Sequence, residues 1–146
     1  MNKASHAWWQ MLVAVTSGLI AFGLILVLLP GLTRQGFSWM IYGSPAHLDA
    51  FAADAVAYIS LVHAVLGAVM IGWGSLMLWL TLGPLRRGSR EAWTMFVAAL
   101  LAWFIPDTAY SLLSGFWQNA VLNTVFALLF ALPLIALKSA IRHGSD

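Results

Sequence analysis

The sequence predicts an all-α integral membrane protein, a four-transmembrane-helix bundle with a short interfacial segment between helices 1 and 2. Of its 146 residues, 62% are hydrophobic and 8% are charged, and the mean hydropathy is +0.88. Water-soluble domains are about half apolar and about a quarter charged. Four apolar runs also approach or exceed the roughly 20 residues needed to cross a bilayer. We therefore expect residues 1–146 to form a single membrane domain.

The composition also excludes several classes of function. Seven basic residues are scattered between apolar runs and form no stripe that could follow a phosphate backbone, so we expect no nucleic-acid partner. The absence of cysteine removes disulfides, thiolate metal sites and iron–sulfur clusters. A bis-histidine haem needs two histidines at one site, and His47, Asp49 and Asp54 match no metal-binding motif. We expect neither a metal nor another cofactor.

The first span is predicted at residues 11–29, which contain no charged side chain. A signal peptide would have an apolar region of about 7–15 residues followed by a small-residue cleavage site. This run is longer and ends in Leu-Pro-Gly. We predict an uncleaved helix that stops at Pro30 and Gly31.

Residues 31–54 form the only sizeable connection and are predicted to lie at the membrane interface. Aromatic residues favour this zone, and the segment contains Phe37, Trp39 and Tyr42 among small residues and single charges. Asp49 and Asp54 precede or begin the next helix. We expect them to stabilise its positive N-terminal end.

The second span is predicted at residues 55–82. Mostly small residues recur along it at helical spacing, namely Ser60, Ala64, Gly67, Ile71 and Gly74. Such a stripe favours close packing between helices in a membrane. It fits contact within the chain, a homo-oligomer or a larger membrane partner.

The third and fourth spans are predicted at residues 92–113 and 120–137, joined by a short turn around Gly115. Four spans place both termini and the connection between spans two and three on one side. That side collects Lys3, Arg86, Arg87, Arg90, Lys138 and Arg142, whereas the other side has only Arg34. The positive-inside rule predicts cytoplasmic termini and an outer segment at 31–54. The chain also looks generically like the small four-helix proteins of bacterial inner (plasma) membranes. We expect no motif to recur between the two halves.

Asp107 is the one deeply placed acid, and it follows the helix-distorting Pro106. An ionised side chain in hydrocarbon costs about 2.5–3.5 kcal/mol on insertion scales, so its partners are of interest. His63, Asp107 and Asn123 each lie eight positions inside their predicted outer boundary, about 12 Å at the helical rise. We predict that they share a polar layer.

Helical spacing also places polar residues on facing stripes. Asp107, Tyr110 and Ser111 share one side of the third span, and Asn119 and Asn123 lie one turn apart on the fourth. An antiparallel pairing should bring Tyr110 or Ser111 towards Asn119, and Asp107 towards Asn123. A hydrogen bond donated by His63 to Asp107 should hold the imidazole in one tautomer.

Three functions fit this layer. It could bind a small amphipathic or lipid-like molecule, with membrane lipids as the surroundings and Trp103, Phe104, Phe126 and Phe130 as apolar walls. The ligand-binding residues would be His63, Trp103, Asp107, Tyr110, Ser111, Asn119 and Asn123. Alternatively, the protein is a structural or assembly subunit whose polar layer only holds helices together. A membrane-embedded lipid-modifying enzyme would use His63 and Asp107 as a general acid/base pair.

Overall fold

The structure is a computed structural model that describes residues 3–142, and within this range it contains helices and turns but no strand. Its helices, in chain order, are α1 (Lys3–Leu28), α2 (Pro30–Tyr42), η1 (His47–Ala50), α3 (Ala53–Leu80), η2 (Thr81–Leu85), α4 (Arg90–Leu113) and α5 (Trp117–Arg142). The predicted all-helical class is confirmed. Four segments are long and apolar enough to cross a membrane, namely Ser5–Leu28, Ala53–Leu85, Arg90–Leu113 and Trp117–Lys138.

The described chain divides into two compact units. The central unit is Gly18–Ser75, and the terminal unit combines the residues up to Ser17 with those from Leu76 onward. Helices α1 and α3 each contribute to both units.

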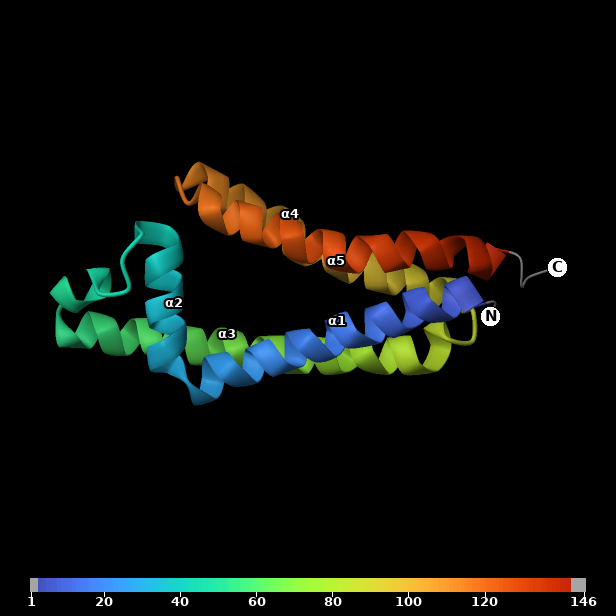
Figure 1. The fold of residues 1–146 in the computed structure, drawn as a ribbon, viewed down its shortest axis with the longest axis horizontal. Coiled ribbons are helices and arrows are strands. Elements are labelled where there is room, and N and C mark those ends of the chain that lie inside the picture. The colour runs from blue at the N-terminus through green and yellow to red at the C-terminus, as the bar shows by residue number, and fades with distance from the viewer. Residues whose placement is uncertain (1–2, 143–146) are drawn as a thin grey trace. The chain divides into compact units, whose positions relative to one another are not determined.

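In the central unit, the first span ends because of Pro30. The residue before a proline is disfavoured in helical geometry, and Leu29 has φ −128° and ψ 55°. Pro30 then starts α2, since a proline needs no hydrogen-bond partner in the first turn of a helix. Gly31 thus lies inside a new helix, where we had predicted only a stop. Figure 1 shows α2 turning sharply away from the end of α1.

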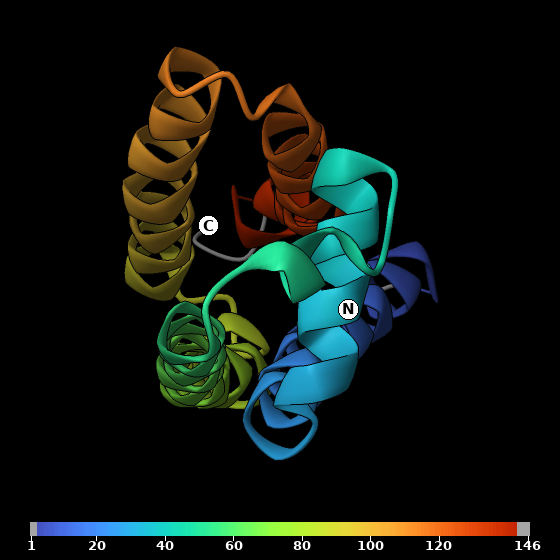
Figure 2. The ribbon, with the colours of Figure 1, turned by 90° about the vertical axis from the view of Figure 1, so that its left-hand side faces the viewer.

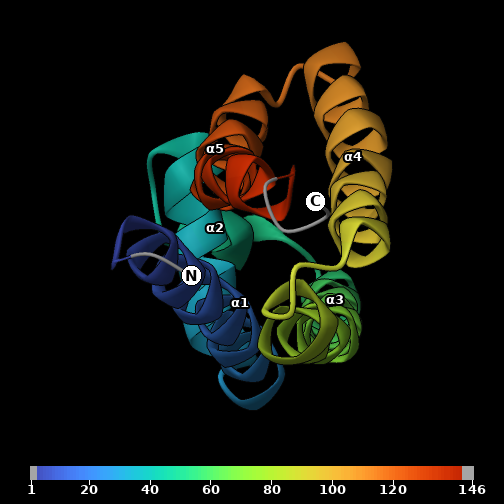
Figure 3. The ribbon, with the colours of Figure 1, turned by 90° about the vertical axis from the view of Figure 1, so that its right-hand side faces the viewer.

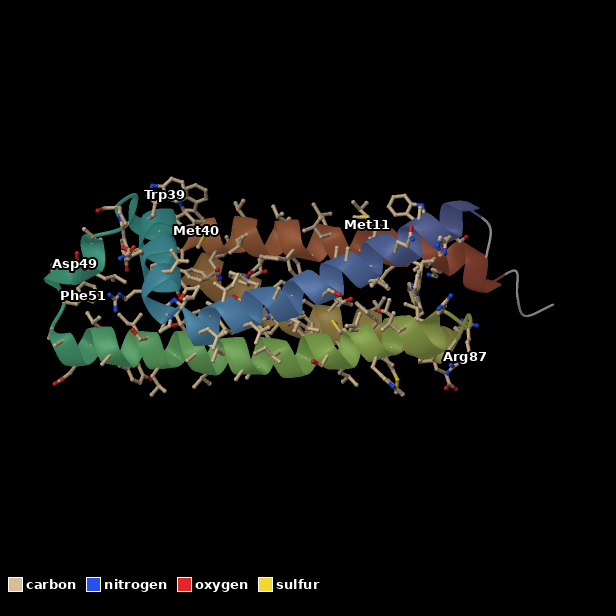
Figure 4. All side chains as sticks on the ribbon, turned by 60° about the horizontal axis from the view of Figure 1, so that its bottom comes forward. Met11, Trp39, Met40, Asp49, Phe51 and Arg87 are labelled. Atoms are coloured by element: carbon tan, nitrogen blue, oxygen red, sulfur yellow. The ribbon has the colours of Figure 1, made fainter. Side chains whose placement is uncertain are left out.

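The connection after α2 is fixed by local hydrogen bonds. Gly43 adopts φ 71° and ends the helix with its N–H bonded to the Trp39 carbonyl. The Ser38 hydroxyl donates to the Ser44 carbonyl at 2.7 Å. Figure 2 shows the chain passing from α2 through this connection to the start of α3, and Figure 4 places Asp49 and Phe51 on it. The segment 31–54 is therefore largely helical.

Close helix packing joins α1 to α3 in the central unit. A Cβ added at Gly67 would lie 2.5 Å from the Gly23 carbonyl oxygen, and one added at Gly23 would lie 2.7 Å from the Gly67 carbonyl oxygen. A Cβ at Gly74 would lie 2.8 Å from Ile20. Of the uses left open for the stripe from Ser60 to Gly74, packing within the chain is thus the one observed at Gly67 and Gly74.

In the terminal unit, α4 and α5 form an antiparallel hairpin, with the two helices side by side in Figure 1. Ser89 caps the start of α4 by accepting a hydrogen bond from the Ala92 N–H at 3.2 Å. At the other end Gly115 has φ 81°, and the Phe116 N–H donates to the Ser111 carbonyl at 2.8 Å. This is a Schellman-type end, which reverses the chain within three residues.

The interior of this hairpin is apolar over most of its length. Phe96 and Phe130 are 0% and 1% exposed, and their ring centroids lie 5.9 Å apart. Leu134 and Leu137 continue the buried face of α5 at 1% and 5% exposure. Phe130, which was predicted to wall a ligand pocket, lies within this apolar interior.

Two tryptophans hold helix ends in the terminal unit. Trp9 of α1 donates its indole N–H to the Thr81 carbonyl at 2.9 Å, and the Arg86 guanidinium lies 4.7 Å from its ring centroid. Trp93 of α4 donates to the Leu134 carbonyl at 2.8 Å, with the Lys138 ammonium 4.7 Å from its ring. We call these arrangements the tryptophan clamps. Figure 3 shows the turn that leads from α3 to α4, and Figure 4 labels Arg87 on it.

The clamps reveal a recurrence that the sequence-based prediction of no repeated motif missed. Residues 9–14 read Trp-Gln-Met-Leu-Val-Ala, and residues 93–98 read Trp-Thr-Met-Phe-Val-Ala. The fourth residue of each, Leu12 and Phe96, is 0% exposed. In both copies a tryptophan near the start of one helix secures a carbonyl on a later helix, and a cation four or five residues further on covers the ring.

Candidate functional site

Asp107 lies at the centre of a polar network between α4 and α5. Its Oδ2 accepts a hydrogen bond from the Trp103 indole N–H at 3.1 Å, and its Oδ1 accepts one from the Asn119 amide at 3.0 Å. The Ser111 hydroxyl lies 3.4 Å from Oδ1. The carboxylate is therefore held from both helices, by donors that are all uncharged.

The directions of these hydrogen bonds are fixed by the chemistry of the groups. The Ser111 hydroxyl lies 2.7 Å from the Asp107 carbonyl. Because a carbonyl only accepts, the Ser111 hydroxyl donates its proton to it. Its oxygen must then accept from Asn119 Nδ2 at 2.8 Å. This contact orients the Asn119 amide with its second N–H towards Oδ1. Because indole is also only a donor, both carboxylate oxygens face donors, an arrangement that matches the ionised form.

The pairing between helices differs by one turn from the predicted one. Ser111 contacts Asn119, which was one of the predicted pairings. Asp107, however, also bonds to Asn119. Asn123 is buried and donates instead to the Thr108 hydroxyl at 3.5 Å. The reason is the path of α5, which runs along the side of α4 that carries Thr108 and Ser111.

Tyr110 lies outside this network. We predicted it on the same stripe as Asp107, but its side chain is 72% exposed. Consecutive residues of a helix point about 100° apart, so a neighbour of Ser111 leaves the interface when Ser111 is centred on it. Tyr110 instead adds an exposed aromatic ring to the flank of α4 beside Asp107.

His63 belongs to the central unit and lies ten residues into α3, two more than predicted because the helix starts at Ala53. Its Nδ1 lies 2.7 Å from the Ile59 carbonyl. Since a carbonyl only accepts, Nδ1 carries a proton, and the neutral ring presents Nε2 as an acceptor. The Phe37 ring packs edge-on against it at 5.2 Å. The tautomer is thus set by Ile59, a role that we had predicted for Asp107.

A hydrogen bond between His63 and Asp107 stays a prediction. The observed tautomer of His63 determines which protonation states would allow it. Both the carboxylate and a neutral Nε2 are acceptors. Their direct pairing therefore requires one further proton, carried either by the imidazole or by the carboxyl group.

The charge of Asp107 has no basic residue near it along the chain. Residues 91–137, which include nearly all of α4 and most of α5, contain no lysine, arginine or histidine. Across the described residues, no group of three or more histidine, cysteine or acidic side chains is placed to hold a metal ion. Any positive partner of this carboxylate must come from outside residues 91–137.

Sequence reasoning missed Thr108 and the tryptophan clamps. Thr108 lies one residue from Asp107, and only the observed path of α5 brings it to Asn123. The clamps had a readable signal in the repeated Trp-x-Met pattern. Their carbonyl partners had none, because any backbone carbonyl has the same chemistry.

Comparisons with protein-family models, with curated proteins and with solved structures find no match for this chain, so its fold and site stand on their own geometry.

Proposed function

We propose that the protein is a four-span inner-membrane protein that binds a small amphipathic or lipid-like ligand at an outward-facing polar layer centred on Asp107. The observation that carries the proposal is a half-buried carboxylate whose two donors, Trp103 and Asn119, are neutral, within a stretch, residues 91–137, that contains no basic residue. An intramembrane acid of this kind is a functional candidate because its burial is costly. The layer combines such a polar group with surrounding apolar and aromatic surface, which is typical of small-molecule sites.

Several features support the proposed position of this site. Asp107 lies six residues from the end of α4, and Asn123 lies six residues from the start of α5. Both therefore lie about 9 Å from the turn that joins the helices. Under the positive-inside rule this turn faces outward, because the arginines lie at the opposite end of α4. The apolar part of the hairpin, around the packed rings of Phe96 and Phe130, would lie in the inner leaflet.

Mass spectrometry under native conditions tests this proposal. The full-length protein, extracted from membranes in a non-ionic detergent, is expected to carry a small molecule, and Asp107→Asn is expected to lose it while keeping its helical content. Glu91→Gln is the matched control, because Glu91 is an exposed acid at the other end of α4. If the wild-type protein carries no such molecule, the proposal that it binds a ligand is wrong.

A structural or assembly subunit is the second candidate. The donors around Asp107 all come from the chain itself, which also suits a clasp between two helices. In addition, α3 exposes a broad apolar face, formed by Tyr58, Leu61, Val62, Val65, Leu66 and Val69. Such a face suits lipid or a partner helix. A second protein chain or a defined oligomer in the same mass spectra supports this candidate.

A further inference from the structure

We infer that the Asp107 site takes a cationic headgroup, specifically the ammonium group of an alkylamine-like amphiphile. This inference rests on the proposed function and names the class of ligand. It excludes headgroups that only accept hydrogen bonds, such as quinones, and anionic headgroups such as phosphates.

The donors of the network are committed within the protein. The Trp103 N–H serves Oδ2, the Ser111 hydroxyl serves the Asp107 carbonyl, and Asn119 divides its amide between Oδ1 and Ser111. A ligand that reaches this layer therefore meets a carboxylate with remaining acceptor capacity, since each oxygen has two lone pairs. It must bring its own donor.

The charge balance selects a cation among possible donors. The two groups that donate to the carboxylate, Trp103 and Asn119, are neutral, and residues 91–137 contain no basic side chain, so its formal charge of −1 is uncompensated within that stretch. An alcohol would supply a hydrogen bond without charge. An ammonium supplies both, and charge-assisted hydrogen bonds are about twice as strong as neutral ones.

Aromatic surface beside the carboxylate favours an organic cation over a metal ion. Trp103 contacts Asp107 directly, and its ring packs against Phe104 with centroids 6.3 Å apart. Tyr110 is exposed on the same flank of α4. Aromatic rings attract ammonium groups, and apolar side chains can hold an alkyl tail. A small metal ion would need several more oxygen ligands than one carboxylate supplies.

A series of amphiphiles with one chain length tests the inference. The full-length protein in non-ionic detergent is titrated with decylammonium, decanol or decanoate, and binding is followed by native mass spectrometry and by the thermal unfolding midpoint. Decylammonium is expected to bind at least about tenfold more tightly than decanol. Its binding is also expected to raise the thermal unfolding midpoint. Asp107→Asn should remove this preference, whereas Glu91→Gln should keep it.

The remaining outcomes separate this inference from the proposed function. Equal, Asp107-dependent binding of decanol and decylammonium would overturn the ammonium assignment while leaving an amphiphile site. Stabilisation by sodium chloride alone, lost in Asp107→Asn, would assign an inorganic cation instead. If no amphiphile binds in an Asp107-dependent way, both the assignment and the proposed ligand site are wrong. The comparison of headgroups uses the wild-type protein, so it does not depend on the folding of a variant.

Discussion

At the scale of single residues, the position of Asp107 is set by donors of fixed chemistry. Indole and a committed serine hydroxyl leave no freedom in which atom donates, so the carboxylate is constrained on both oxygens. Removing one donor should cost more free energy than its hydrogen bond alone, because a half-buried charged group is then left short of a partner. The network therefore links the stability of the hairpin to the orientation of one acid.

Replacing Trp103 by phenylalanine tests this link. The variant keeps an aromatic ring but removes the N–H that serves Oδ2. We expect a loss of about 1–3 kcal/mol in the free energy of unfolding, because a charged acceptor loses a donor. Thermal or denaturant unfolding in detergent, followed by circular dichroism, measures it.

The same substitution at Trp79 provides the control. Trp79 lies on α3 and its side chain is 65% exposed. Trp79→Phe should change the unfolding free energy by less than about 0.5 kcal/mol. An equal effect of the two substitutions would mean that the indole N–H of Trp103 is not what stabilises the hairpin.

At the scale of secondary-structure elements, helix contacts are made by two different means. In the central unit, Gly23 and Gly67 let the backbones of α1 and α3 approach closely. In the terminal unit, the tryptophan clamps connect a side chain on one helix to a carbonyl on another. Small-residue contacts and side-chain hydrogen bonds are the usual ways in which helices associate within a membrane.

The glycine contact makes a testable difference between two positions on α3. Gly67→Ala would place a Cβ 2.5 Å from the Gly23 carbonyl oxygen, so the helices must separate. At Gly72 an added Cβ meets nothing within 4 Å. We expect Gly67→Ala to lower the unfolding free energy by about 1–3 kcal/mol, as overpacking does.

Gly72→Ala should instead be neutral or stabilising by up to about 1 kcal/mol, because alanine favours the helix. Both variants are compared with the wild type in one unfolding assay in detergent. If Gly67→Ala behaves like Gly72→Ala, the close approach of α1 and α3 does not exist in the protein.

At the scale of the whole molecule, the distribution of basic residues predicts how the chain is threaded. The predicted cytoplasmic side holds six of the seven lysine and arginine residues, and Arg34 alone lies on the other side. In the central unit Arg34 donates to the Ser60 hydroxyl at 3.3 Å, so this cation has a partner within the chain. The asymmetry favours one orientation strongly.

The orientation is directly measurable because the natural sequence contains no cysteine. Asp49→Cys and Glu91→Cys introduce single thiols at exposed positions, one after α2 and one at the start of α4. In intact spheroplasts, a membrane-impermeant maleimide should label Asp49→Cys only. Labelling of Glu91→Cys without disruption of the membrane would reverse the predicted threading.

The sequence by itself determined the helical class and the approximate positions of four apolar helices. Apolar runs, prolines and glycines act locally, so the end of α1 at Pro30 and the turn at Gly115 were readable in advance. The helix within residues 31–54 was not, because its aromatic and small residues also suit an irregular interfacial segment.

Only the tertiary structure decided which polar side chains meet. Helical spacing placed Tyr110 and Ser111 equally well beside Asp107, and the path of α5 along α4 selected Ser111 and brought in Thr108. A rotation of one helix by a fraction of a turn exchanges such neighbours without changing the hydrophobic pattern. The acid was therefore evident from the sequence, whereas its neutral donors, and with them the case for a cationic ligand, depend on how two helices pack.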